Sequence, residues 1–364
     1  MEEHIRTLLL DRAEDVPEPG PIPPGLETRM RRRTYVAASV ATAATVVILA
    51  GALIGLRALA APPSLPAHPH PTPIPVYHHN GNVTAFVPLG RLITVDPATG
   101  RSTGAISCGD GCAISSVDWS PDGREIAFIR RGGPPLPGVG YGATTVLAIR
   151  NVETGATRPV AACTLPGMKM LGCSDLAAVD WAAASSRIAF TSGGAIWLID
   201  ANGHGLRRLA FGQDEPSLSP DGTRVAFTID NEVHTSNADG SGLAFLVGGS
   251  SPSWSPDGSR IAVVQDPIRR HLPKGFHDDP YQLEVVLVSV ERKTHTIAFI
   301  QPGCCIGGRV EGPTWSPDGS KLAVVFPRGH SISSMRLIVF GADGRGVRVL
   351  TPASPIRPAW RPVP

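Results

Sequence analysis

The segments VDWSPDGREIAF (117–128), SLSPDGTRVAF (217–227), SWSPDGSRIAV (253–263) and TWSPDGSKLAV (314–324) are copies of one repeat in a chain of 364 residues. In each copy a Ser-Pro-Asp-Gly turn separates a short strand from an apolar strand. Proline presets φ at the second position of such a turn, and aspartate and glycine suit the next two. The repeat therefore predicts a β-hairpin, in which the turn aspartates have a structural role. These aspartates are Asp122, Asp221, Asp257 and Asp318.

Two further segments keep the frame of the repeat. Residues 179–190 (VDWAAASSRIAF) have the strands without a Pro-Asp-Gly turn, and residues 358–362 (PAWRP) have only the first strand. Equivalent residues of the six copies follow one another at intervals of 62, 37, 36, 61 and 45 residues. A period of about 40 residues is typical of a four-stranded propeller blade, so the longer intervals predict insertions. The equivalent residues are Trp119, Trp181, Leu218, Trp254, Trp315 and Trp360.

The pattern Trp-Ser-Pro-Asp-Gly-x-x-Ile-Ala-Phe resembles the TolB-type, WD-like propeller repeat, and the resemblance covers roughly residues 82–364. The resemblance implies an all-β fold, namely a six-bladed β-propeller. It says little about function, because one fold can have many functions. The chain departs from the pattern at residues 182–185, where the turn residues are missing, and at Leu218, where the aromatic residue is missing.

The two ends of the repeat region complement each other. Residues 83–107 supply outer strands without an inner strand of the repeat type, whereas residues 358–362 supply an inner strand without outer ones. Pairing the two segments closes the ring and removes strand edges that would otherwise favour aggregation. We therefore expect the C-terminal strand to complete the first blade.

An apolar stretch lies ahead of the repeats. Residues 35–56, from Tyr35 to Leu56, are 22 residues without a charge, and such a helix spans a hydrocarbon core of about 30 Å. Four arginines lie within residues 29–33 and only Arg57 follows closely, so the positive-inside bias places the N-terminus in the cytoplasm. We expect a single-pass anchor in the cell membrane and an extracytoplasmic propeller. The alternative, a signal peptide cleaved before Ala61, fits less well with the length of the stretch and of the segment before it.

These features divide the chain into four parts. Residues 1–33 are expected to be a cytoplasmic segment and residues 34–57 the transmembrane helix. Residues 58–81 form a linker rich in proline and histidine, which we expect to be an extended spacer. Residues 82–364 form the propeller. The linker histidines have no cysteine or carboxylate nearby, so we predict no metal site.

The cysteines all follow the apolar stretch, and their even number suits an oxidising compartment. Cys108 and Cys112 flank a Gly-Asp-Gly turn, and Cys163 and Cys173 bracket a loop of nine residues. We predict a local disulfide for each pair, the alternative being that several cysteines are free and buried. The other two cysteines are adjacent in sequence, and their pairing stays open.

Strand order sorts the loops of a propeller into two faces. If the strands of a blade are named a to d from the axis outward, the a–b and c–d turns share one face and the b–c and d–a loops share the other. The a–b and c–d turns are short, whereas residues 130–142 and 266–282 are long b–c insertions. Because binding residues usually lie in loops on a rigid scaffold, we predict that a protein or small-molecule ligand binds the b–c/d–a face. Candidate residues in the second insertion are Arg269, Arg270, His271, Lys274, His277, Asp278 and Asp279.

Composition and motifs narrow the function classes. The net charge is +2 and no Lys/Arg run occurs outside residues 29–33, which excludes nucleic-acid binding. There is no G-x-S-x-G motif, which argues against a serine hydrolase, and no cofactor is expected. We predict a protein- or ligand-binding module, a sensor or scaffold, and not an enzyme. The alternative is a propeller enzyme acting on a carbohydrate or lactone, which needs polar residues at the axis where the b strands read Ile-Ala-Phe-Ile or Ile-Ala-Val-Val.

Overall fold

The computed structural model describes residues 79–363, except for 88–90, 109–110, 141, 170, 172–174, 212–213, 266–282, 292–293, 302–309, 329–330 and 354–356. The chain divides into two compact units, Met1–His70 and Pro71–Pro364, and all described residues belong to the second. The predicted cytoplasmic segment, transmembrane helix and most of the linker lie outside the described residues. The part of the chain that is described contains no helix long and apolar enough to span a membrane.

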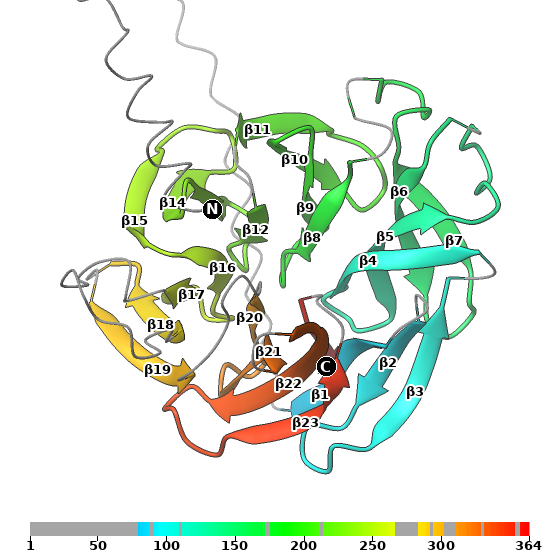
Figure 1. Cartoon of the computed structure of the whole chain (residues 1–364). Helices are drawn as coiled ribbons and strands as arrows, with labels where there is room; N and C mark the ends of the chain where they lie inside the picture. Colours follow the sequence, from blue (N-terminus) through cyan, green and yellow to red (C-terminus); the bar gives the residue numbers. More distant parts are fainter. Residues whose placement is uncertain are drawn as a thin grey trace, which may run out of the picture. The chain divides into compact units, whose positions relative to one another are not determined.

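The described chain folds into six four-stranded antiparallel sheets arranged around a common axis (Figure 1). This confirms the predicted all-β, six-bladed propeller. We number the blades in chain order: blade 1 is β24-β1-β2-β3, and blades 2 to 6 are β4–β7, β8–β11, β12–β15, β16–β19 and β20–β23.

The bounds of the strands follow the repeat. The inner strands are β4 (Cys112–Trp119), β8 (Ala177–Trp181), β12 (Asp214–Leu218), β16 (Ser250–Trp254), β20 (Glu311–Trp315) and β24 (Ala359–Val363). The second strands are β1 (His79–Val87), β5 (Glu125–Gly132), β9 (Arg187–Ser192), β13 (Arg224–Ile229), β17 (Arg260–Gln265) and β21 (Lys321–Arg328). The third strands are β2 (Arg91–Val95), β6 (Thr145–Asn151), β10 (Ala195–Asp200), β14 (Glu232–Asn237), β18 (Leu283–Ser289) and β22 (Ser331–Gly341). The outer strands are β3 (Ser102–Ser107), β7 (Thr157–Ala161), β11 (Arg207–Phe211), β15 (Ala244–Gly248), β19 (His295–Gln301) and β23 (Arg348–Ala353).

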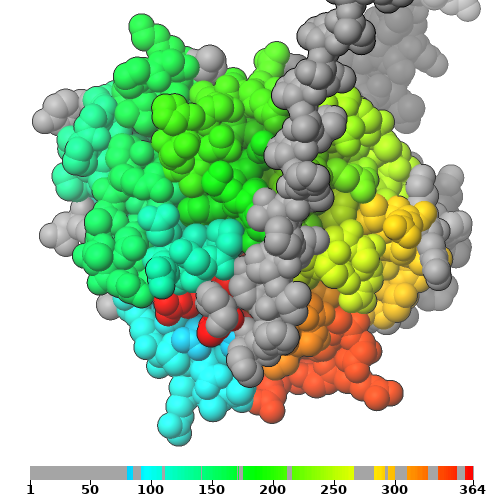
Figure 2. Space-filling model, turned by 180° about the vertical axis from the view of Figure 1, so that it is seen from behind, coloured from blue at the N-terminus to red at the C-terminus, as the bar shows by residue number. Residues whose placement is uncertain are grey.

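The ring closes through its C-terminal strand, which confirms the predicted pairing between the two ends of the repeat region. Strand β24 pairs antiparallel with β1, with Val363 opposite His79 and Ala359 opposite Thr84. The C-terminal strand (red) lies next to the first strands of the ring (blue to cyan) in Figures 1 and 2. Trp360 is 4% exposed, so the closing strand is anchored by a buried indole.

The turn aspartates have the structural role that the repeat predicts. The Ser120 hydroxyl donates a hydrogen bond of 2.6 Å to Asp122 Oδ1, and the backbone N–H of Arg124 donates one of 3.0 Å to the same oxygen. Partial burial raises the pKa of Asp122, but these hydrogen bonds outweigh it and hold the pKa below its ordinary value. Asp221, Asp257 and Asp318 have the same arrangement and the same direction of shift.

Blade 3 forms its turn without the motif. The backbone N–H of Ala182 donates to the carbonyl of Arg187, and the Ser185 hydroxyl accepts a hydrogen bond of 3.2 Å from the backbone N–H of Arg187. In blade 2 the equivalent N–H, that of Glu125, donates to the Ser120 hydroxyl, so Ser185 takes over part of the role of the missing turn serine.

The hydrophobic core lies between neighbouring blades. Ile129 and Leu147 of blade 2, for example, share one cluster of buried side chains with Trp181 and Phe190 of blade 3. Since each blade buries the face of the next, a closed ring leaves no blade with an uncovered apolar face.

The structure contains the predicted disulfide between Cys108 and Cys112, whose Cα atoms are 6.0 Å apart. It joins the end of β3 to the start of β4, a d–a connection. Cys163 is also disulfide-bonded. Its predicted partner, Cys173, lies outside the described residues.

Candidate functional site

The inner strands of the blades converge on the axis, and each ends next to its a–b turn. We use the term axial residue for the position immediately before the equivalent aromatic or apolar residue of each repeat. The axial residues of blades 2 to 6 and then blade 1 are Asp118, Asp180, Ser217, Ser253, Thr314 and Ala359.

Three axial side chains connect their blade to the following one. Asp118 Oδ2 accepts a hydrogen bond of 2.7 Å from the backbone N–H of Trp181, and Asp180 Oδ2 accepts one of 2.7 Å from the backbone N–H of Leu218. Ser217 Oγ accepts one of 3.1 Å from the backbone N–H of Trp254. An acceptor at the axial position therefore serves the assembly of the ring, and a serine suffices for it.

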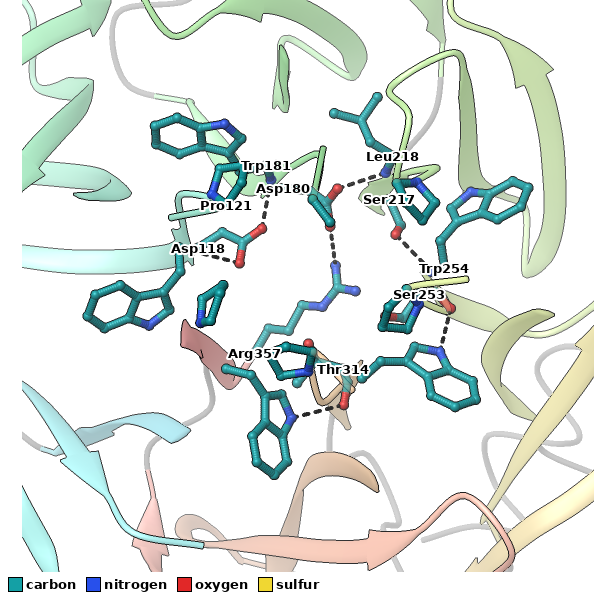
Figure 3. A pocket seen from close by; sticks show the side chains of 18 of the residues that line it. Asp118, Pro121, Asp180, Trp181, Ser217, Leu218, Ser253, Trp254, Thr314 and Arg357 are labelled. Carbon is teal, nitrogen blue, oxygen red and sulfur yellow. Dashed lines mark hydrogen bonds and ion pairs between the residues drawn. The ribbon is translucent and has the colours of Figure 1, made fainter. Parts of the chain in front are cut away.

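A cavity of about 110 Å³ lies between these residues at the axis. Its wall consists of axial residues and of the indole groups that follow them, and it reaches the a–b turns. Figure 3 shows the side chains arranged in a ring around it. Prolines at equivalent positions of the repeat line the cavity in five blades, four of them in a–b turns and one in β24, and Ala183 takes this place in blade 3. The prolines are Pro121, Pro220, Pro256, Pro317 and Pro362, and the indole groups belong to Trp119, Trp181, Trp254, Trp315 and Trp360.

Arg357 lies just before β24 and extends across the centre of the ring in Figure 3. Its Nη1 is 3.8 Å from Asp180 Oδ1 in blade 3. Its Nη2 donates to the carbonyl oxygens of Pro252 in blade 5 at 3.2 Å and Pro313 in blade 6 at 3.3 Å. These carbonyls precede the axial residues, so the guanidinium lies at the d–a end of the cavity. Arg357 forms the floor of the cavity and ties the closing strand to three other blades.

Two carboxyl groups and one guanidinium are the ionisable side chains that line this cavity. Burial, together with the neighbouring charge of Asp180, raises the pKa of Asp118 to about 7, against the opposing effect of the Trp181 and Trp119 N–H groups and of Arg357. Burial also raises the pKa of Asp180, while Arg357, the Leu218 N–H and Ser217 act to lower it. When both carboxyl groups are ionised, the lining has a net charge of −1.

The candidate residues predicted in the loop of residues 266–282 lie outside the described residues, and their role stays a prediction. The sequence placed the functional face on the side of the b–c and d–a loops. The cavity, however, lies at the opposite ends of the inner strands, beside the short a–b turns. The cavity therefore lies on the face of the a–b and c–d turns, where the turns are short.

Asp118, Asp180 and Arg357 were not among the residues predicted from the sequence. The signal for the aspartates is the repeated Val-Asp-Trp of blades 2 and 3, where the other copies have Ser, Ser, Thr and Ala before the equivalent residue. The b strands are apolar, whereas the polar residues at the axis belong to the inner a strands. Arg357 lies outside the repeat motif, and its position gave no such signal.

No protein-family model and no curated protein sequence matches this chain. Solved structures with a similar fold include TolB from Acinetobacter baumannii, with 19% identity and a TM-score of 0.55 over 78% of this chain and 67% of that one. A chain of the nidogen/laminin complex has 9% identity and a TM-score of 0.52 over 78% of this chain and 98% of that one. A protein described as a putative TolB from Agrobacterium tumefaciens has 15% identity and a TM-score of 0.50 over 79% of this chain and 100% of that one. At these identities the likeness shows the propeller fold and nothing about the ligand.

Proposed function

We propose that this chain is a membrane-anchored, extracytoplasmic binding module, a sensor or scaffold, whose propeller receives a protruding group of a protein partner in its axial cavity. The observation that carries this proposal is the cavity itself, a rigid concave site in which apolar indole and proline groups surround a few polar ones. Binding sites in proteins generally have this composition.

The size of the cavity supports a protruding side chain as the bound group. Pockets that enclose a drug-sized ligand have volumes of about 300–1,000 Å³. The axial cavity, at about 110 Å³, is large enough for several water molecules or for the end of one long side chain. A whole sugar ring or lactone with its surroundings needs more space, so this cavity favours a protruding side chain over such a substrate.

The membrane anchor and the orientation belong to the same proposal. They are supported by the uncharged stretch of residues 35–56 and by the arginines of residues 29–33. In intact cells, added protease is expected to remove an epitope tag placed after residue 364 and to spare one placed before residue 1. Recovery of a soluble form that begins at Ala61 would contradict the anchor.

Blocking the cavity tests the binding function. Five blades place a proline at the cavity, and blade 3 has Ala183 there. Ala183→Trp puts an indole at this position without a change in charge. We expect full-length protein with this change, solubilised in detergent, to lose the partner that the wild type captures after cross-linking in its own membranes. Ala98→Trp is the matched control, because Ala98 is exposed in the c–d turn of blade 1, on the same face and away from the axis. Equal capture by Ala183→Trp and wild type would contradict the proposal.

A further inference from the structure

We propose that the group received by the axial cavity is an organic cation, the ammonium group of a lysine or an amino terminus or the guanidinium of an arginine. This inference rests on the proposed binding function and names the chemistry of the ligand.

The first observation is the imbalance of charge at the axis. Arg357 Nη1 lies 3.8 Å from Asp180. The Asp118 carboxylate accepts hydrogen bonds from the Trp119 and Trp181 backbone N–H groups, and no salt bridge joins it to a cation among the described residues. Serine in blade 4 fulfils the same connecting role as Asp118 without a charge. The charge in blade 2 is therefore not required for the connection between blades. When both carboxyl groups are ionised, the lining has two carboxylates and one cation.

The second observation lies on the opposite side of the ring. Blade 5 faces blade 2 across the axis, and its axial residue Ser253 is 4% exposed and lines the cavity. Within the part of the chain that is described, the Ser253 hydroxyl makes no hydrogen bond, in contrast to Ser217, whose hydroxyl accepts one from Trp254. Because Ser253 lines the cavity, its hydroxyl is available to accept a hydrogen bond from a ligand that donates N–H groups.

The indole groups of the lining supply no further cation site. Arg224 already lies over the Trp254 ring, Arg260 over the Trp315 ring and Arg361 over the Trp119 ring. The labelled indole groups of Trp181 and Trp254 extend away from the centre of the cavity in Figure 3. Recognition therefore rests on the Asp118 carboxylate and the Ser253 hydroxyl, which suit an ammonium or guanidinium group, whereas the carboxylate repels an anionic one.

Small probes test this assignment in the full-length, detergent-solubilised protein. Titrations with n-butylammonium and n-butylguanidinium, followed by tryptophan fluorescence, are expected to give saturable changes, because five indoles line the cavity. We expect Asp118→Asn to weaken this binding about tenfold or more. Binding should also weaken as pH falls below about 7 in the wild type, where Asp118 takes up a proton, and this pH dependence should be smaller in Asp118→Asn, in which Asp180 is the remaining carboxyl group of the lining.

Glu153→Gln is the matched control, because it removes one carboxylate from an exposed c–d turn on the same face. It should bind the cations like the wild type. Equal responses to butyrate or n-butanol, or unchanged cation affinity in Asp118→Asn, would overturn the cation assignment. That failure is distinguishable from failure of the binding function, because capture of the partner would still be lost in Ala183→Trp.

Discussion

Deletion of residues 356–364 is expected to lower the free energy of unfolding by more than about 5 kcal/mol. The deletion removes all of β24, including the buried indole of Trp360, and the guanidinium of Arg357 that bridges three other blades. Loss of a buried Trp side chain alone costs about 3–5 kcal/mol. Strand β1 would in addition expose its inner edge, which now pairs with β24. Urea unfolding followed by tryptophan fluorescence measures the effect.

A peptide added in trans separates loss of closure from general misfolding. A synthetic peptide of residues 354–364 should restore the stability of the truncated protein in proportion to its concentration, because it supplies the missing strand. A peptide of the same composition in scrambled order is the control and should have no effect. An unchanged melting temperature after the deletion would contradict closure of the ring through β24.

The second large effect is expected from Arg357→Met, which should lower the free energy of unfolding by about 3 kcal/mol at pH 8. The side chains of Arg357 and Asp180 are 12% and 13% exposed, so removal of the guanidinium leaves a carboxylate with little access to water. The double variant with Asp180→Asn should recover most of the loss. Arg361→Met is the matched control, because Arg361 also donates to a backbone carbonyl, that of Gly123, and has no carboxylate partner among the described residues. Equal losses in the two single variants would contradict a special role for the Asp180 charge.

The loss in Arg357→Met should depend on pH with a definite sign. Because burial raises the pKa of Asp118 from 3.8 to about 7, the folded chain keeps a proton through this range that the unfolded chain has lost. The free energy of unfolding of the wild type therefore receives a contribution that falls as pH rises from about 4 to about 7 and is constant above it. Arg357 lowers the pKa of Asp180, so its removal raises that pKa further and makes the loss greatest above pH 7. A loss that is the same at pH 5 and pH 8 would contradict this assignment.

The fold was predictable because the residues that form each hairpin turn are adjacent in the sequence. The Ser-Pro-Asp-Gly segments predict the positions of the hairpin turns, and their spacing gives the period of a blade. The half-blades at residues 83–107 and 358–362 predicted the closing strand, which β24 and β1 confirm. The Cys108–Cys112 pair was predictable for the same reason, since its two residues flank one turn.

The axial site was not predictable from the repeat in the same way. Asp118 and Asp180 are far apart in sequence, and their encounter depends on two neighbouring blades presenting equivalent positions to one axis. Arg357 reaches them only because the last strand of the chain lies in the first blade. The departure from the repeat, aspartate where other copies have small residues, was visible, but its meaning required the knowledge that inner strands line the cavity.

Site-specific photo-cross-linking of the full-length protein in its own membranes tests the central claim, that the partner is received at the axis, most directly. A photoreactive phenylalanine analogue is placed at residue 186, which is exposed in the a–b turn of blade 3, so that the analogue lies beside the cavity without filling it. The same analogue at residue 279, in the long b–c insertion, reports on the face that the loops had suggested. We expect a cross-linked partner from position 186 and none from position 279. A partner captured from position 279 alone would contradict the axial site.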